Sequence, residues 1–394
     1  MKIIMILLSF GIFANDLTLK NAVSLAIKNN PELKVIKKNA EIKKNSGIAN
    51  SQYPNPEIEV ETSDFLGTGG YSGFKNSEVS LSISQEIVLN GKNSKLIDLA
   101  DSETKTIALE LKKQKINLEY KIENIFLELL TLKKLQTLLI KNKEISENIF
   151  KTVENIKNSG EISQLEVIKA KIDERNSIIA LKTNKNKINS LKKLLFIVIG
   201  DKDLKFDNIA GELETNLEIN NKNKVENIDI KIKESVYQSG LQFLKLEEAN
   251  SIPNLTFKLG ANRYQEFGDY SFTFAISMPI PLFNSNKAKI RESRFKIDRN
   301  KLEITSVKLK LKEELGRFTN ELKILKEELS NLKNDVLPMA KESLELAREG
   351  YREGEFKYLD LLDAKKTFIS IEELYIKKLS RFNLLKLRID YLLK

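Results

Sequence analysis

The sequence contains no histidine, no cysteine and no tryptophan. Without histidine it lacks the commonest general base and transition-metal ligand. Without cysteine it can form no disulfide, no thiolate metal site and no acylated N-terminal cysteine. A glycine-rich phosphate loop is also missing. These absences argue against most enzyme classes, so we expect a chain that is not an enzyme, has no cofactor and holds no metal site.

Long apolar runs are scarce as well. The one pronounced run, Ile3 to Phe13, follows Lys2 and precedes Ala14. This order is typical of a secretory signal peptide, which we place at residues 1–14. The run is too short for a membrane helix, which needs ~20 apolar residues, and no later segment supplies one. The alternative for this run is a short buried helix of a cytosolic protein.

Neither the basic nor the acidic residues are clustered along the chain. The net charge is +10, from 65 Lys and Arg against 55 Asp and Glu. Nucleic-acid binding needs a clustered basic face, whereas lysine and glutamate alternate throughout this sequence. We therefore expect no nucleic-acid partner.

Proline is rare, and its positions separate two kinds of segment. The seven prolines are at 31, 54, 56, 253, 279, 281 and 338. Between them lie long segments with apolar residues at steps of three, four and seven, as in Leu111, Leu118, Ile122, Ile125 and Leu129, which is the pattern of a coiled-coil face. It predicts helices at about 19–51, 92–158, 162–199, 228–249, 287–348 and 356–394.

The chain is also an internal duplication. The segment Gly160 to Lys171 recurs as Gly354 to Lys365, and each copy follows a long charged helix pattern. A repeat of this size indicates one structural unit written twice. We place the first repeat at 15–215 and the second at 216–394, each with a long helix that turns back as an antiparallel hairpin.

Each repeat contains a pair of alternating segments. They predict strands at about 57–65, 78–89, 254–263 and 270–283, and Phe272, Phe274 and Ile276 illustrate the alternation. Strands of ~9–11 residues with period two are typical of outer-membrane barrels. A periplasmic sandwich with one face in water has the same period and is the alternative.

The polar side of these strands predicts the lining of a channel. Its members are Glu57, Glu59, Glu61, Ser80, Ser82, Ser84, Glu86, Lys258 and Thr273. Four strands cannot close a barrel, which needs ~8, and an open edge cannot face lipid. Three protomers would supply twelve strands. The predicted fold class is therefore mainly α, with long coiled-coil hairpins and four membrane strands per protomer.

Several motifs resemble those of TolC-family outer-membrane efflux proteins. Asn29 to Leu33 is followed by Tyr53 to Glu57, and the second strand ends in Ser84 to Lys92, which is similar to the heavy-metal efflux branch. Late in the chain, Val336 to Ala340 leads to Tyr351 to Gly354 and Leu359 to Ala364. Their order and duplication carry the resemblance over almost the whole sequence.

The resemblance implies a homotrimer in the outer membrane, with a helical barrel extending into the periplasm. The implied partners are a periplasmic adaptor, an inner-membrane pump of the RND type and outer-membrane lipid. The hairpin tips, at Gly160, Glu161, Gly354 and Glu355, are expected to contact the adaptor. The implied activity is passive export, with metal cations as a candidate substrate.

The resemblance also implies a periplasmic gate. Its constriction corresponds to Asp360 and Asp363, which a three-residue spacing places on one helix face. The polar links that hold such a gate closed correspond to Tyr351 and Glu166. Where the family has a basic gate residue, this chain has Phe356, beside Lys357. Pro338 is expected to kink its helix, whereas Glu144 stands at that place in the first repeat.

Two other functions remain open at this level. The outlet of a type I protein secretion system would share the fold and differ in its pump. A secreted coiled-coil scaffold or adhesin would explain the helices and the signal, but not the paired strands in each repeat.

Overall fold

The structure is a computed structural model that describes residues 16–158, 162–201, 206, 208–213, 216–218 and 226–394. The signal peptide predicted at 1–14 lies outside these residues. The chain forms two compact units, and each takes residues from both sequence repeats. Unit 1 comprises Met1–Leu33, Gln114–Asn227 and Lys310–Lys394, and unit 2 comprises Lys34–Lys113 and Ile228–Leu309.

Unit 2 contains an antiparallel sheet of four strands in the order β1-β2-β3-β4. The strands are β1 (Glu57–Ser63), β2 (Glu78–Ile87), β3 (Leu255–Tyr264) and β4 (Tyr270–Ser277). The register places Ile58 opposite Ile83, Ile83 opposite Leu259, and Leu259 opposite Phe274. Apolar residues therefore form continuous rows across all four strands.

The fourth strand is shorter than the alternation in the sequence suggests. It ends at Ser277, although apolar residues alternate as far as Leu282. Pro279 and Pro281 have no backbone N–H group to donate to a ladder. The segment 278–286 is thus a connection between strand and helix, and the predicted end at 283 is wrong for this reason.

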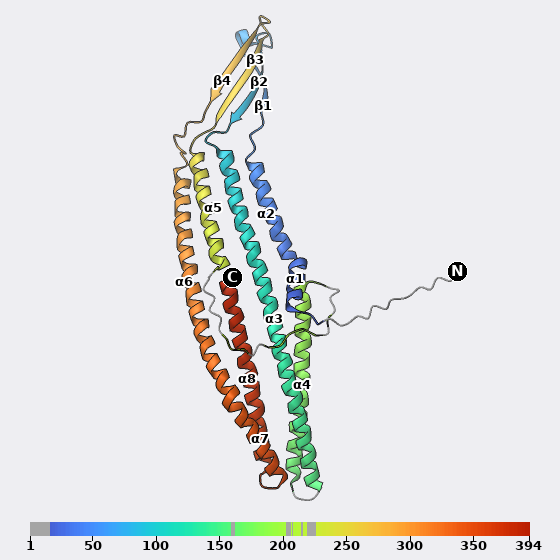
Figure 1. The fold of residues 1–394 in the computed structure, drawn as a ribbon. Coiled ribbons are helices and arrows are strands. Elements are labelled where there is room, and N and C mark those ends of the chain that lie inside the picture. Colours follow the sequence, from blue (N-terminus) through green and yellow to red (C-terminus); the bar gives the residue numbers. More distant parts are fainter. Residues whose placement is uncertain (1–15, 159–161, 202–205, 207, 214–215, 219–225) are drawn as a thin grey trace, which may run out of the picture. The chain divides into compact units, whose positions relative to one another are not determined.

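The helices of unit 2 continue from the sheet (Figure 1). They are α2 (Pro31–Asn50), α5 (Ile228–Asn250) and the first parts of α3 (Lys92–Asn158) and α6 (Lys287–Asn331). Asn90 and Asn286 stand before α3 and α6, and each has a φ of 58°. Asparagine tolerates this left-handed conformation better than most residues. Both repeats thus place an asparagine at the entry to their long helix, and in the first repeat Gly91, with a φ of 62°, follows it.

Unit 1 holds the two helical hairpins. It contains α1 (Leu19–Asn29), α4 (Gln164–Ile199), α7 (Leu337–Arg352), α8 (Tyr358–Leu393) and the remaining parts of α3 and α6. The helix predicted at 19–51 is two helices. Pro31 begins α2, and the side chain of Asn30 accepts a hydrogen bond from the N–H of Leu33 at 3.1 Å, which caps the new helix.

A π-helical turn, Leu332–Val336, separates α6 from α7 just before Pro338. Proline cannot make the usual backbone bond, and widened turns are a common way to accommodate such a break. The corresponding residue of α3, Glu144, lies within one uninterrupted helix of 67 residues. As expected from Pro338, the long helix of the second repeat is interrupted at this place, whereas the long helix of the first repeat is continuous.

Two apolar clusters stabilise unit 1. The first joins both hairpins through Val153 of α3, Ala170 of α4, Leu344 of α7 and Phe368 of α8. The second joins Leu322, Leu325 and Leu329 of α6 to Leu379, Phe382 and Leu385 of α8. Among the described residues, no helix has the length and apolarity needed to cross a membrane.

Candidate functional site

The polar face of the sheet brings the predicted lining residues together. Glu59 lies opposite Ser82, Ser82 opposite Gly260, and Gly260 opposite Thr273. All nine predicted positions lie on this face. They alternate with mainly apolar residues along each strand, and the register sets them opposite polar or small residues of the neighbouring strands. Glu59 forms an ion pair with Lys258. Glu57 and Glu61 have no ion pair among the described residues, so the face carries an excess of carboxylates.

The opposite face of the sheet is apolar and exposed to solvent in the single chain. Phe272 has 89% of its surface exposed, and Ile58, Val60 and Phe274 have more than half. A soluble protein rarely leaves so large a contiguous apolar surface open. This face has the character of a lipid-facing barrel exterior.

Glu86 shares the polar face but has a structural partner. Its carboxylate accepts a hydrogen bond of 2.6 Å from Asn254, whose carbonyl oxygen accepts 2.6 Å from the ammonium group of Lys92. These contacts join the end of β2, the start of α3 and the start of β3. Glu86 therefore stabilises the junction of the two repeats, a role that the sequence did not reveal.

The turn between α7 and α8 forms the tip of the second hairpin. The N–H groups of Glu355 and Phe356 both donate to the carbonyl of Gly350, at 2.8 and 3.1 Å. Gly354 has a φ of 81°, which glycine adopts without strain. A Cβ atom on Gly350 would lie 2.3 Å from the ring of Phe356. Phe356 thus packs over Gly350, while Gly160 and Glu161 lie outside the described residues.

The two aspartates predicted at the constriction are both exposed on α8. Asp360 accepts a hydrogen bond of 2.9 Å from the N–H of Lys357 and so caps the helix. The carboxylate of Asp363 makes no hydrogen bond or ion pair with any described residue. Asp363 is therefore the freer of the two carboxylates.

Tyr351 lies at the end of α7 and is only 5% exposed. Its hydroxyl has no hydrogen-bond partner among the described residues. Burial, with a smaller contribution from the charge of Glu166, raises the pKa of Tyr351 to about 12. Its ring meets that of Tyr358 edge-on, with centroids 6.1 Å apart. Tyr351 and Glu166 are thus electrostatic neighbours, but no hydrogen bond links them within one chain.

A buried charge pair connects the two hairpins close to these residues. Lys365 of α8 is 2% exposed and contacts the carboxylate of Asp173 on α4 and the hydroxyl of Ser146 on α3. Burial lowers the pKa of Lys365, and Asp173 opposes that shift. Neither residue of this pair belongs to a functional motif of the sequence described above. Its signal was a lysine at an apolar position of the helix repeat, between Leu361 and Phe368.

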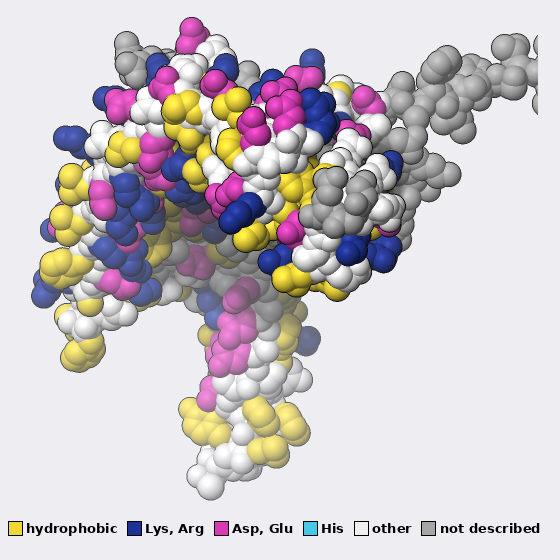
Figure 2. All heavy atoms as spheres, turned by 90° about the horizontal axis from the view of Figure 1, so that it is seen from below, with side chains coloured by type: hydrophobic (Ala, Val, Ile, Leu, Met, Phe, Trp, Pro, Cys, Tyr) yellow, Lys and Arg dark blue, Asp and Glu magenta, His cyan; other side chains and the backbone are white. Residues whose placement is uncertain are grey.

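Charges elsewhere on the surface are mixed. On the face seen in Figure 2, basic and acidic side chains intersperse and do not form one basic patch. Among the described residues, no group of three or more acidic side chains is arranged to hold a metal ion.

Comparisons with known proteins agree with this geometry. The family described as "Outer membrane efflux protein" matches residues 227–378. The cobalt-zinc-cadmium resistance protein CzcC of Cupriavidus metallidurans is 22% identical over 371 residues, which cover 92% of this chain and 86% of the relative.

Solved structures share the fold over nearly the whole chain. The structure of CusC superposes with a TM-score of 0.77 at 14% identity. The superposition covers 95% of this chain and 91% of the CusC chain. The outer membrane protein VceC of Vibrio cholerae gives 0.76 at 15% identity and covers 95% of both chains. The likeness therefore includes the first repeat, which the family match does not reach.

The fold class predicted from the sequence is confirmed, and so is the expectation of a channel rather than an enzyme. The family match over residues 227–378, the relative of similar length and the shared fold all agree with the family resemblance seen in the sequence.

Proposed function

We propose that the chain assembles as a homotrimer whose sheets close into one barrel of twelve strands. The observation that carries this proposal is the open sheet: in the described structure, β1 and β4 each pair on one side only. An unpaired strand edge cannot be exposed to lipid, because its backbone groups would find no partner there. Pairing of β4 with β1 of the next copy satisfies both edges.

Helix surfaces next to the two edge strands support the same arrangement. Val35 and Ile42 lie seven residues apart on α2, which precedes β1, and Leu302 and Leu309 lie seven apart on α6, which follows β4. All four are more than half exposed in the single chain. Apolar residues at heptad spacing are the knobs of a coiled coil. A neighbouring copy of the chain would cover both stripes.

The lumen of such a trimer would be acidic. Each copy contributes Glu57, Glu59 and Glu61, and only Glu59 is neutralised, by Lys258. Rings of carboxylates favour cations in a pore. With a cobalt-zinc-cadmium resistance protein among the relatives, metal cations are the substrate that the proposal favours. An inner-membrane pump of the RND type and a periplasmic adaptor, which would contact the hairpin tips, complete the pathway.

The proposed gate combines Asp360 and Asp363 with Tyr351 and Glu166. The two aspartates share the exposed side of α8, where threefold symmetry would arrange them as rings. The unpartnered hydroxyl of Tyr351 is buried in the single chain, so α7 would have to shift in the closed state for a polar group of a neighbouring copy to reach it. Phe356 cannot supply a charge, so Lys357 or Arg352 would take the place of the family's basic gate residue.

The oligomeric mass of detergent-extracted protein from separated membrane fractions tests the assembly. Three copies in the outer-membrane fraction are expected. A monomer in the soluble periplasmic fraction would contradict the proposal and favour a secreted coiled-coil scaffold. Co-purification of the trimer with a protein-exporting ATPase, instead of an RND pump, would favour the outlet of a type I secretion system.

Single-channel recording tests the gate. Asp363→Asn and the double variant Asp360→Asn, Asp363→Asn should both reduce the preference for cations, and the double variant should do so more. Glu355→Gln at the tip is the control for loss of a nearby negative charge. Unchanged conductance and selectivity in the double variant would remove both aspartates from the gate.

A further inference from the structure

The connection between β4 and α6 is apolar, exposed and free of charge. Met278, Ile280 and Leu282 follow β4 in the chain, and each is at least half exposed. The N–H of Leu282 donates to the carbonyl of Ile280 at 2.8 Å, so the chain turns at Pro281. Phe283 is fully exposed. No charged residue occurs between Tyr270 and Asn286, in a chain of which 30% is charged. We call residues 278–283 the strap.

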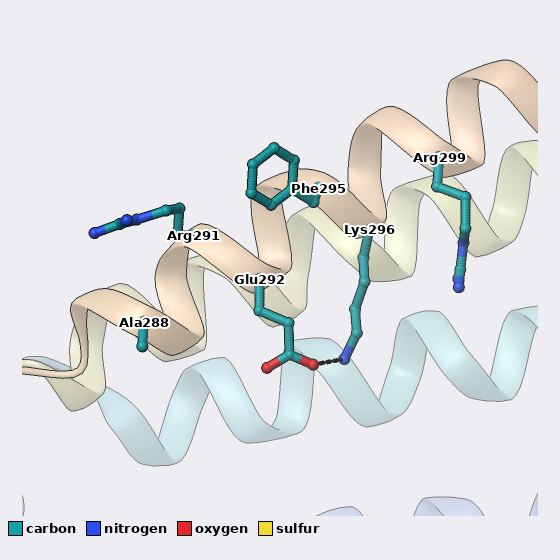
Figure 3. Close-up of a pocket in the computed structure, with 6 residues that line it drawn as sticks. All are labelled: Ala288, Arg291, Glu292, Phe295, Lys296 and Arg299. Carbon is teal, nitrogen blue, oxygen red and sulfur yellow. Dashed lines mark ion pairs between the residues drawn. The ribbon is translucent and has the colours of Figure 1, made fainter.

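Basic residues follow the strap directly. Lys287, Lys289 and Arg291 lie in the first two turns of α6, and no hydrogen bond or ion pair joins their side chains to another described residue. Figure 3 shows Arg291 projecting, like Phe295, from the side of α6 opposite the Glu292–Lys296 ion pair, whose atoms are 2.6 Å apart. A shallow groove along this helix is lined by Ala288, Arg291, Glu292, Phe295, Lys296 and Arg299, so it has three basic side chains and one acidic side chain. The local surface thus passes from apolar to cationic within a few residues.

The equivalent connection of the first repeat lacks these features. Between β2 and α3 there are only Val88 to Gly91, and Val88 and Leu89 are half-buried. Its lysines have partners within the chain: Lys92 donates to Asn254 at 2.6 Å, and Lys95 donates to the carbonyl of Asn90 at 2.5 Å. The exposed apolar and basic combination therefore belongs to the second repeat alone.

We propose that the strap and the first turns of α6 form a docking surface for anionic phospholipid of the membrane leaflet nearest the helices. The strap follows β4 directly and is exposed and apolar like the sheet face, so acyl chains that reach the end of the sheet would also reach Ile280, Leu282 and Phe283. Lys287, Lys289 and Arg291 would then meet the phosphate layer, where each basic group gains attraction to anionic lipid. This inference rests on the proposed barrel. It also gives the chain a membrane contact outside the strands.

The absence of tryptophan allows a direct test. Phe283→Trp in the full chain, reconstituted into phosphatidylcholine vesicles, places one fluorophore on the strap, and Leu282→Trp provides a second reporter. Quenching is compared between brominated phosphatidylglycerol and brominated phosphatidylcholine at equal mole fraction. We expect both lipids to quench. The apparent association constant for phosphatidylglycerol should be at least fivefold higher, since roughly a fivefold gain is expected for each nearby basic side chain.

Two sets of variants give the test its controls. In the Phe283→Trp background, Lys287→Gln, Lys289→Gln and Arg291→Gln together should equalise the two lipids. Lys310→Gln, Lys312→Gln and Lys323→Gln remove the same charge from exposed positions farther along α6 and should leave the preference intact. Phe272→Trp, on the middle of the sheet face, reports insertion of the barrel itself.

The outcomes separate the two proposals. Quenching of the Phe272→Trp reporter without quenching of the strap reporters would overturn the docking surface and leave the barrel intact. If brominated phosphatidylglycerol and phosphatidylcholine quench the strap reporters equally while Lys287, Lys289 and Arg291 are all present, these basic residues do not bind the anionic headgroup, and this part of the proposal is overturned. Absence of quenching at all three positions would contradict the membrane barrel, and the docking surface with it.

Discussion

At the scale of single residues, the buried pair Lys365–Asp173 links the two hairpins. Removing one partner of a buried ion pair leaves an uncompensated charge and costs about 3–5 kcal/mol. Asp173 keeps 19% of its side-chain surface exposed, so we expect Lys365→Met to lower the free energy of unfolding by about 3 kcal/mol, measured by chemical denaturation.

The repeat supplies a matched control for this prediction. Lys171 occupies the corresponding position of the first hairpin but is exposed, so Lys171→Met should change stability by no more than about 0.5 kcal/mol. Adding Asp173→Leu to Lys365→Met should recover most of the loss, because an apolar pair avoids the buried charge. Equal effects of the two lysine substitutions would show that Lys365 contributes no more than a surface lysine.

Tyr351 makes stability depend on alkaline pH. Its folded pKa of about 12 lies above the ordinary value of 10.0, so the folded chain retains a proton that the unfolded chain releases. The free energy of unfolding is unaffected by ionisation of this tyrosine below pH 10. Between pH 10 and about 12 it falls by about 1.4 kcal/mol per pH unit, because only the unfolded chain releases the proton. Tyr351→Phe should remove this part of the slope in denaturation measured between pH 9 and 12.

The same variant tests whether the hydroxyl is satisfied in the assembly. In the single chain the hydroxyl is buried and has no partner among the described residues, a state that costs about 1–3 kcal/mol. Tyr351→Phe should therefore keep or raise the stability of a monomeric form. A lower threshold for channel opening in the same variant would mean that a neighbouring copy binds the hydroxyl in the closed state.

At the scale of elements, the turn between α7 and α8 depends on the pair Gly350 and Phe356. A Cβ atom at residue 350 would lie 2.3 Å from the phenyl ring, so Gly350→Ala must displace Phe356 and should cost about 1–3 kcal/mol. Phe356→Ala in the same chain should relieve the clash, and the two changes should be strongly non-additive in a double-mutant cycle. Additive effects would mean that the ring does not pack over Gly350 in solution.

The elements were largely predictable from the sequence, and the reasons for the exceptions are local. The long helix 92–158 follows from a proline-free heptad pattern, and the observed bounds agree with it. The end of β4 at Ser277 was missed because alternation continues through Pro279 and Pro281, where hydrogen bonding cannot. The split at Pro31 was missed because apolar periodicity continues across it, while the cap at Asn30 is visible only as a contact.

The site was predicted unevenly for a similar reason. Strand parity alone places Glu57, Ser82 and Thr273 on one face, because parity survives any small error in strand ends. The pairing of Glu86 with Asn254 and of Lys365 with Asp173 joins residues far apart in the chain. Spacing along the sequence carries no information about such contacts.

At the scale of the whole molecule, assembly should depend on the apolar stripe of α6. Leu302 and Leu309 are about two-thirds exposed in the single chain, and they make no contribution to its core. Leu302→Glu with Leu309→Glu should therefore leave each chain folded but weaken association, because carboxylates would be buried between helices. Light scattering in detergent should show a shift from three copies toward one.

A charge-matched control separates this effect from electrostatic repulsion. Lys310→Gln with Lys312→Gln makes the same change in net charge at exposed positions of the same helix and should leave the oligomer intact. Circular dichroism of both double variants should retain the helical signal, since neither change touches a buried residue. If the leucine variant remains trimeric, the stripe faces the lumen or the periplasm, and closure of the barrel rests on the strand edges β1 and β4 alone.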